Sequence, residues 1–163
     1  PHMHAYALES AWTALEQRPR ASRLWVLDVG SGSGYLTACF AALLSVTGFS
    51  DYHVYGVEKV PELADWSCDN LFRANPDLVQ RVNITTGDGR LGLPDHGPFD
   101  IIHVGAAADP LPRALVDQLA VGGRMIVPVG KPGTIQYMHI IDKDASGDVK
   151  QRQSFPVQYV PLS

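Results

Sequence analysis

The stretch LWVLDVGSGSGYLTACFAA, residues 24–42, joins an apolar run, a glycine-rich segment and a helical pattern. The apolar run 24–27 predicts a buried strand, and the spacing of apolar residues after Tyr35 predicts a helix. Between them, Gly30, Gly32 and Gly34 indicate a turn whose backbone can approach a ligand closely, because glycine has no Cβ. A strand, a glycine-rich turn and a helix in this order are typical of the first half of a nucleotide-binding α/β unit.

The spacing of these glycines indicates the kind of ligand. Gly30, Gly32 and Gly34 form a G-x-G-x-G pattern, whereas the dinucleotide-binding fingerprint is G-x-G-x-x-G. Asp28 stands at the carboxyl end of the strand, where such folds bind ligands. Its charge would repel a pyrophosphate and attract a sulfonium or an α-ammonium group. The pattern therefore favours S-adenosylmethionine over a nicotinamide cofactor; the glycines by themselves leave a plain tight turn open as the alternative.

Two further acidic residues end expected strands. Residues 53–57 predict a second strand that ends at Glu58, a position suited to accept hydrogen bonds from ribose hydroxyls. Residues 82–86 predict a third strand followed by Asp88, whose carboxylate can accept a hydrogen bond from an adenine amino group. Taken alone, Glu58 is equally well explained as a solvated glutamate, and it is Asp28 and the glycine turn that favour a binding role.

The rest of the chain predicts alternating helices and strands. Helices are expected at 5–17, 62–74 and 111–120, and strands at 99–104 and 124–129; 135–142 and 149–159 form a terminal antiparallel pair joined by a loop at 144–148. Gly122 and Gly123 are expected to end the third helix with a left-handed cap. The residues expected to face the core are Ala5, Leu8, Trp12 and Leu15 in the first helix and Leu63, Trp66, Leu71 and Phe72 in the second. His103, inside a strand, is interpreted as packed structure.

The composition is that of an ordinary globular protein. The 163 residues are 45% hydrophobic and 18% charged, with a net charge of −4. This length suits one domain, residues 1–163, and the acidic balance gives no reason to expect a nucleic-acid partner. Because no long apolar run or signal-peptide pattern occurs, we expect a cytoplasmic protein without membrane contact. Cys39 and Cys68 are interpreted as buried free thiols.

Several common catalytic motifs are missing from the sequence. It contains no G-x-x-x-x-G-K-[ST] phosphate loop and no G-x-S-x-G nucleophile elbow. Its six histidines lack the spacing of a zinc site, so no metal is expected. After the strand 99–104 it also lacks the Asn/Asp-Pro-Pro-aromatic run of enzymes that methylate amino groups of nucleic acids.

The whole chain resembles the protein-L-isoaspartate O-methyltransferase family. The resemblance runs through PHMHAYALE, VLDVGSGSGYLTACFA, GDGRLG, FDIIHVGAAA, GGRMIVPVG and YVPLS. It implies a Rossmann-like α/β fold with a mostly parallel sheet of about seven strands and helices on both faces. It also implies a monomeric, cytoplasmic repair enzyme that methylates the free carboxylate of L-isoaspartyl and D-aspartyl residues in damaged proteins. The resulting ester collapses to a succinimide, which hydrolyses partly to normal aspartate.

The resemblance also implies a set of cofactor-binding residues. For S-adenosylmethionine and its product S-adenosylhomocysteine these are His4, Asp28, Gly30, Ser31, Gly32, Glu58, Lys59, Asp88, Gly89 and Ser163. Glu58 stands where many members have aspartate, which keeps the acceptor. The family's active-site serine precedes the Pro-His-Met-His block, upstream of Pro1, and relatives continue beyond Ser163. We therefore expect the chain to lack the N-terminal segment, to contain no catalytic residue of its own and to turn over slowly.

Methylation of a carboxylate requires few catalytic side chains. A carboxylate with an ordinary pKa near ~4 is already deprotonated at neutral pH, so its methylation needs no general base. Alignment and exclusion of water are expected to do the work, and alignment can contribute roughly 7–11 kcal/mol. The alternatives left open are a binding domain without turnover and a methyltransferase with another substrate. A nicotinamide-dependent oxidoreductase is disfavoured by Asp28 and by the glycine spacing.

Overall fold

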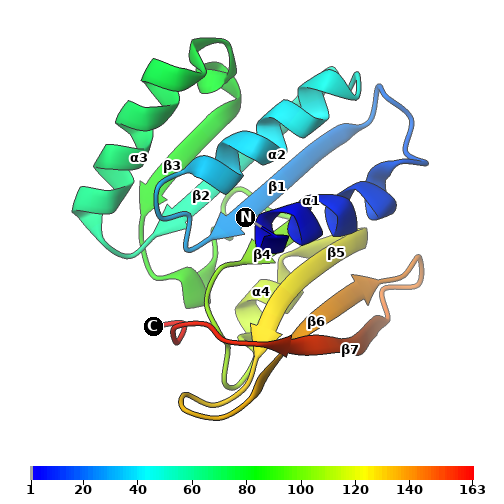
Figure 1. Ribbon diagram of the computed structural model, residues 1–163. Coiled ribbons are helices and arrows are strands. Elements are labelled where there is room, and N and C mark those ends of the chain that lie inside the picture. The colour runs from blue at the N-terminus through cyan, green and yellow to red at the C-terminus, as the bar shows by residue number, and fades with distance from the viewer. Residues whose placement is uncertain (1) are drawn as a thin grey trace.

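The computed structural model describes residues 2–163 and contains a seven-stranded sheet (Figure 1). The strand order is β3-β2-β1-β4-β5-β6-β7. Strands β1 to β5 run parallel, and β6 and β7 are antiparallel to their neighbours. The mostly parallel sheet and the terminal antiparallel pair are therefore confirmed. The strands are β1 (Arg23–Val29), β2 (Asp51–Glu58), β3 (Val82–Thr86), β4 (Phe99–Val104), β5 (Leu119–Val129), β6 (Gln136–Lys143) and β7 (Val149–Val157).

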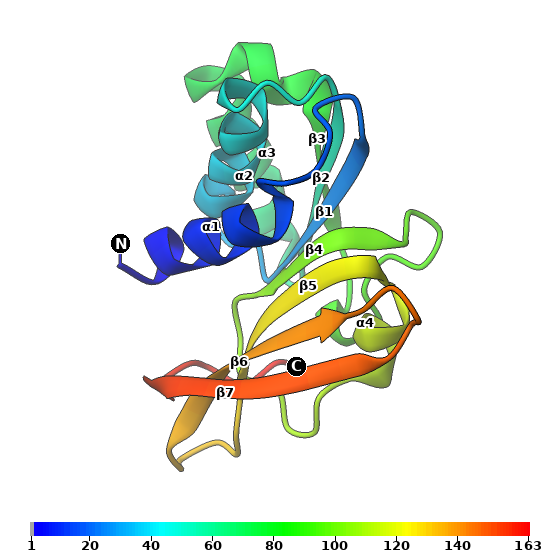
Figure 2. The same cartoon turned by 90° about the vertical axis from the view of Figure 1, so that its right-hand side faces the viewer.

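Helices cover both faces of the sheet. Figure 2 shows α1, α2 and α3 on one side and the short α4 on the other. The helices are α1 (His2–Leu15), α2 (Tyr35–Val46), α3 (Pro61–Ala74) and α4 (Arg113–Asp117), with 3₁₀ turns η1 (Pro76–Arg81) and η2 (Gly89–Leu91). This confirms the predicted two-sided α/β architecture. None of the helices among residues 2–163 is long and apolar enough to span a bilayer.

Strand β1 explains why both faces are covered. Leu24 and Val26 belong to the core cluster beneath α1, α2 and α3. Leu27 and Val29 belong to the cluster that contains Leu115 of α4. Because successive strand residues point to opposite faces, an apolar run without alternation needs a cover on each side. The run at 24–27 therefore specifies a strand that is buried on both faces, which confirms the predicted buried strand.

The predicted core-facing side of α3 is largely wrong. Its buried residues are Ala64, Ser67 and Leu71, whereas Leu63, Trp66 and Phe72 are exposed. The buried stripe consists mostly of small residues because α3 packs closely against the glycine turn: a Cβ on Gly34 would lie 3.0 Å from that of Ser67. Close packing thus selects small side chains, and the large apolar ones lie on the other face.

In α1 the buried residues are Ala7, Ala11 and Leu15. The prediction named Ala5, Leu8, Trp12 and Leu15; of these, Leu8 and Trp12 pack at the margin of the core, and Ala5 is exposed. The helix also lies three residues earlier at its start and two at its end than expected (2–15 instead of 5–17). The buried stripe consists of two alanines and Leu15, spaced four apart on one face of the helix, and Leu15 is the predicted core residue that is fully buried.

The expected helix 111–120 is much shorter in the structure. It ends at Asp117, and Leu119 already pairs with Phe99 as the first residue of β5. The register between β4 and β5 then shifts before Ile101. Gly122, at φ +76°, lies in this irregular stretch, and a Cβ on Gly123 would lie 3.0 Å from the Asp100 carbonyl oxygen. The two glycines therefore shape a bulged strand; the predicted helix cap is wrong.

The interpretation of both cysteines as buried thiols is also corrected. Cys39 is half-buried, and Cys68 is exposed on α3. Burial raises the pKa of both thiols, which keeps them protonated and weakly nucleophilic at neutral pH.

Candidate cofactor-binding cleft

The candidate site lies at the carboxyl ends of β1, β2 and β4. In the sheet β1 pairs with β2 on one side and with β4 on the other. Strands β2 and β3 therefore extend the sheet from one edge of β1, and β4 and β5 extend it from the opposite edge. Ligands of open α/β sheets bind at such a switch point. Gly30 follows β1 and Gly105 follows β4, and the Gly105 N–H donates to the Val29 carbonyl at 2.8 Å. These two glycines border two adjoining cavities, named below the Asp28 cavity and the Glu58 cavity.

The Asp28 cavity has a volume of about 220 Å³. It is bounded by residues of the glycine turn, of β1 and β4, of α1 and α2, and of the C-terminal segment that follows β7 (residues 158–163). They include Met3, His4, Asp28, Gly30, Ser31, Gly32, Ser33, Tyr35, Leu36, His103, Gly105 and Tyr159. The structure thus brings His4, Asp28, Gly30, Ser31 and Gly32, five of the sequence-predicted cofactor residues, to the wall of one cavity.

Asp28 is held by two side chains. Only 1% of its surface is exposed. The Thr37 hydroxyl donates to its Oδ2 at 2.7 Å, and Nδ1 of His103 lies 2.8 Å from its Oδ1. Each carboxylate oxygen therefore has one protein partner and further acceptor capacity. Asp28 thus lies at the carboxyl end of β1, as predicted.

Helix α1 contributes His4, together with Met3, to the wall of this cavity. Its ring lies 5.5 Å from the ring of Tyr35, centroid to centroid. Desolvation is the main cause that lowers the pKa of His4, and the nearby His103 lowers it further, while Asp28 acts in the opposite direction. A neutral imidazole at neutral pH can accept as well as donate a hydrogen bond.

Ser31 carries an unsatisfied hydroxyl. Its Oγ is a buried side-chain oxygen without a hydrogen-bond partner among the described residues. It lies under the glycine turn, where a Cβ on Gly56 of β2 would come within 3.2 Å of it. A buried polar atom without a partner costs roughly 1–3 kcal/mol. Such an atom at the wall of a cavity is a reason to expect a polar ligand there.

The Glu58 cavity adjoins the first and measures about 240 Å³. Glu58, 8% exposed, lies at its border. Its Oε2 accepts from the Gly32 N–H at 2.9 Å, and its Oε1 accepts from the Val60 N–H at 3.1 Å. Glu58 therefore ties the glycine turn to the start of α3. It is not the free, solvated glutamate of the alternative interpretation.

The C-terminal segment forms the far wall of the Glu58 cavity. The Ala107 N–H donates to the Val160 carbonyl, and the Leu162 N–H donates to the Ala107 carbonyl, each at 2.8 Å. Lys59 Nζ donates to Ser163 Oγ at 3.0 Å. Lys59, Gly89 and Ser163, three further sequence-predicted cofactor residues, all border this cavity.

Asp88 differs from the other predicted residues because it is outside the walls of both cavities. Its two oxygens accept hydrogen bonds from the Arg90 side chain at 2.7 to 3.1 Å. These bonds are the main cause that lowers the pKa of Asp88 to about 2. The Asp88 carboxylate is therefore hydrogen-bonded to Arg90. Its predicted contact with adenine stays a prediction.

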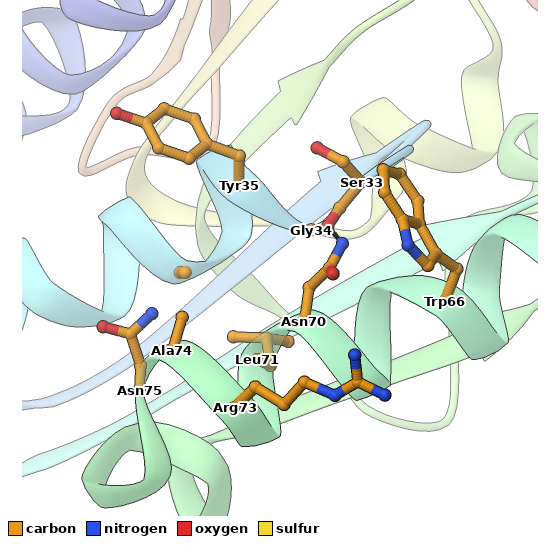
Figure 3. A pocket seen from close by; sticks show the side chains of 10 residues that line it. Ser33, Gly34, Tyr35, Trp66, Asn70, Leu71, Arg73, Ala74 and Asn75 are labelled. Atoms are coloured by element: carbon orange, nitrogen blue, oxygen red, sulfur yellow. Dashed lines mark hydrogen bonds between the residues drawn. The ribbon is translucent and has the colours of Figure 1, made fainter.

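A separate cavity of about 420 Å³ lies between α2 and α3 (Figure 3). Figure 3 shows the Asn70 side chain pointing toward Gly34 and Ser33, and its Nδ2 donates to the Ser33 carbonyl at 3.3 Å. Trp66 and Arg73 stand at the border. No carboxylate lines this cavity, and it is not part of the candidate site.

Sequence reasoning missed His103 and Thr37. His103 is buried as expected, but it contacts Asp28 rather than only packing. A signal for both exists in the pattern: His103 is the register partner of Asp28 across β1 and β4, and Thr37 lies on the first turn of the helix that follows the glycines. Recognising them requires the strand order, which the sequence does not state.

The two cavities fit a ligand that is cationic at one end and carries hydroxyl groups at the other. Asp28 offers a negative charge at one end, and Glu58 offers remaining acceptor capacity at the other. Glycine backbone lies between them, so that a Cβ on Gly30 would project to within 3.9 Å of the Gly105 backbone. The Ser31 hydroxyl, which lacks a partner among the described residues, adds a polar group at the wall of the Asp28 cavity. An α-ammonium group and a ribose, as in S-adenosylmethionine, match this arrangement.

Comparisons with known proteins agree with this fit. The family model described as protein-L-isoaspartate(D-aspartate) O-methyltransferase matches residues 1–163. A protein-L-isoaspartate O-methyltransferase from Triticum aestivum is 44% identical over all of this chain and 67% of its own length. The enzyme named protein-L-isoaspartate O-methyltransferase 2 of Arabidopsis thaliana is 41% identical, with half of its length covered. The chain thus spans between about half and two thirds of these relatives.

A solved structure shows the same fold. The putative protein-L-isoaspartate O-methyltransferase of Plasmodium falciparum, in complex with S-adenosyl-L-homocysteine, superimposes with a TM-score of 0.84 at 34% identity. The match covers all of this chain and 74% of that one. Because the family model matches the chain from end to end, the chain belongs to the protein-L-isoaspartate(D-aspartate) O-methyltransferase family.

Proposed function

We propose that the protein transfers a methyl group from S-adenosylmethionine to the free carboxylate of L-isoaspartyl and D-aspartyl residues in damaged proteins. The observation that carries this proposal is the cleft with Asp28 at one end and Glu58 at the other, in a chain that matches the family along its whole length. When bound, S-adenosylmethionine would supply a sulfonium-activated methyl group.

The residues that would hold this cofactor come from both cavities. Asp28 would receive the α-ammonium group and Glu58 the ribose hydroxyls, through acceptor capacity not used by their protein partners. The glycine turn would lie along the ligand, with the Ser31 hydroxyl as an added polar contact. His4, Lys59, Asp88, Gly89 and Ser163 are proposed to complete the binding set.

The remaining chemistry needs position rather than proton transfer. The acceptor carboxylate is ionised at neutral pH, with an ordinary pKa near ~4. The protein's part is to bring this carboxylate into line and to keep water away from the reacting atoms. The C-terminal segment, pinned to Ala107 by two hydrogen bonds, is suited to exclude water from the Glu58 cavity.

The proposal also covers the location, the assembly state and the partners of the protein. We propose that the protein works as a cytoplasmic monomer, with isoaspartyl-containing proteins and peptides as partners and without a nucleic-acid, membrane or metal partner. The net charge of −4 supports the absence of nucleic acid, since such binding usually needs a basic surface.

A repair assay tests the activity. An isoaspartyl peptide is incubated with the protein and S-adenosylmethionine, and the aspartyl form is measured by chromatography against an incubation without cofactor. Aspartyl peptide should accumulate only with both protein and cofactor. Equal amounts in the two incubations would contradict the proposal.

A further inference from the structure

We propose that His103 is a positioning residue for Asp28, which orients the Asp28 carboxylate toward the α-ammonium group of the methionine moiety. This inference rests on the proposed function for the identity of the ligand. The contact itself, between Nδ1 of His103 and Oδ1 of Asp28 at 2.8 Å, is a property of the protein alone.

The sheet itself creates this pair. Asp28 and His103 are register partners on the parallel strands β1 and β4, so their side chains project from the same face at the same level. Both are buried, with side-chain exposures of 2% for Asp28 and 9% for His103. No loop movement is needed to form the contact, which makes it a preorganised feature of the fold.

Hydrogen-bond chemistry defines which nitrogen carries the proton. An ionised carboxylate only accepts, so Nδ1 of His103 must be the donor. Thr37 of α2 donates to the other oxygen at 2.7 Å. The carboxylate is thereby fixed from two elements, β4 and α2, and cannot rotate without losing one of two buried bonds.

This fixed orientation matters because of what surrounds it. Asp28 and His103 both border the cavity that also contains the glycine turn and His4. The acceptor capacity of Asp28 that Thr37 and His103 leave free is available to a ligand in that cavity. A cation there would meet a carboxylate already oriented, and the entropy of ordering it would not oppose binding.

Packing alone is the competing explanation for His103. Its ring lies 6.1 Å from that of Phe40, centroid to centroid, and an aromatic residue of similar size would preserve that contact. The two explanations predict different effects on the binding of different parts of the ligand. A positioning role concerns only the methionine end, whereas a packing defect would affect the whole cleft.

The test compares two ligands on three proteins. S-adenosylhomocysteine carries the α-ammonium group, and 5′-methylthioadenosine keeps the adenosine part without it. Calorimetric affinities are measured for the wild type, for His103→Phe and for His103→Asn, whose amide can still donate near the position of Nδ1.

We expect His103→Phe to bind S-adenosylhomocysteine about 10- to 100-fold more weakly, the loss typical of one hydrogen bond to a charged group. Its affinity for methylthioadenosine should be unchanged, and His103→Asn should recover most of the loss. Equal weakening for both ligands would overturn the proposal in favour of packing, and so would unchanged binding of S-adenosylhomocysteine in His103→Phe.

A second measurement does not depend on the ligand or on a folded variant. Long-range ¹H–¹⁵N correlation spectra of the wild type report which ring nitrogen of His103 is protonated. A proton on Nδ1 is expected, and a neutral ring protonated only on Nε2 would overturn the proposal. If the wild type binds no S-adenosylhomocysteine while Nδ1 is protonated, the proposed function fails and the Asp28–His103 contact stands.

Discussion

The Gly32 N–H donates to Oε2 of Glu58 at 2.9 Å, which joins the glycine turn to the end of the neighbouring strand. The other oxygen of Glu58 accepts from the Val60 N–H. One buried side chain thus braces the turn and also borders the cavity proposed for the ribose. Bracing and ligand binding are coupled at this residue, and substitutions there should affect both.

Glu58→Ala should weaken cofactor binding and destabilise the fold. Each lost hydrogen bond to the carboxylate is worth on the order of 1.5–3 kcal/mol. Calorimetry with S-adenosylhomocysteine and thermal melting measure the two effects. Glu58→Asp is the matched control, because it keeps the charge with a shorter reach. A fully retained affinity in Glu58→Ala would mean that Glu58 is not the ribose acceptor.

Asp28→Asn should weaken binding of S-adenosylhomocysteine while leaving the fold intact. The amide keeps the shape and one acceptor oxygen but removes the charge that would attract the α-ammonium group. Isothermal titration and melting temperature are compared with those of the wild type. A sharp fall in melting temperature at unchanged affinity would show that Asp28 is structural.

Gly89→Ala should disturb both stability and the Glu58 cavity. A Cβ at this position would lie 2.6 Å from Cγ1 of Val29 and 3.3 Å from Cδ1 of Leu162, and overpacking of this kind typically costs about 1–3 kcal/mol. Gly87→Ala is the control, since its Cβ would meet only Val57 at 3.3 Å. Denaturant unfolding measures both variants. Equal stabilities of the two variants would contradict the prediction.

The Asp88–Arg90 pair should contribute to stability in a defined acidic window. The pKa of Asp88 lies at about 2 in the fold, below the ordinary value of 3.8 for an aspartate. Because the folded pKa is the lower one, the contribution is present above the unfolded pKa and is lost as the pH falls from about 3.8 to about 2. The pair is solvent-exposed, so the effect should be small and weaker in high salt.

Unfolding curves at several pH values check this for the wild type and Asp88→Asn. The variant should lose stability less steeply than the wild type across the window. Parallel pH profiles would show that the pair contributes nothing measurable.

The sequence predicts this fold well where patterns are local. The run at 24–27 and the three following glycines specify a strand, a turn and a helix without reference to the rest of the chain. Contacts between segments that are distant in the sequence are harder to predict. Small residues such as Ala64 and Ser67 proved to be the buried face of α3, because a close approach to the glycine turn outweighs the tendency to bury Trp66 and Phe72.

In the candidate site, too, local features could be predicted from the sequence and contacts between distant segments could not. The three acidic residues at strand ends follow from strand boundaries, and the structure places two of them, Asp28 and Glu58, at the cavities. The contact of His103 with Asp28 depends on β4 lying beside β1, a tertiary fact. The arginine that engages Asp88 is only two residues away, but whether its side chain turns back depends on the local turn η2.

Labelled methyl transfer tests the central claim most directly. The protein is incubated with S-adenosylmethionine labelled in its methyl group and with two peptides that differ only in an isoaspartyl or a normal aspartyl residue. The isoaspartyl peptide should acquire label that is released by mild base, as expected for a carboxyl methyl ester, and the aspartyl peptide should not. Equal labelling of the two peptides, or no labelling of either, would contradict the account.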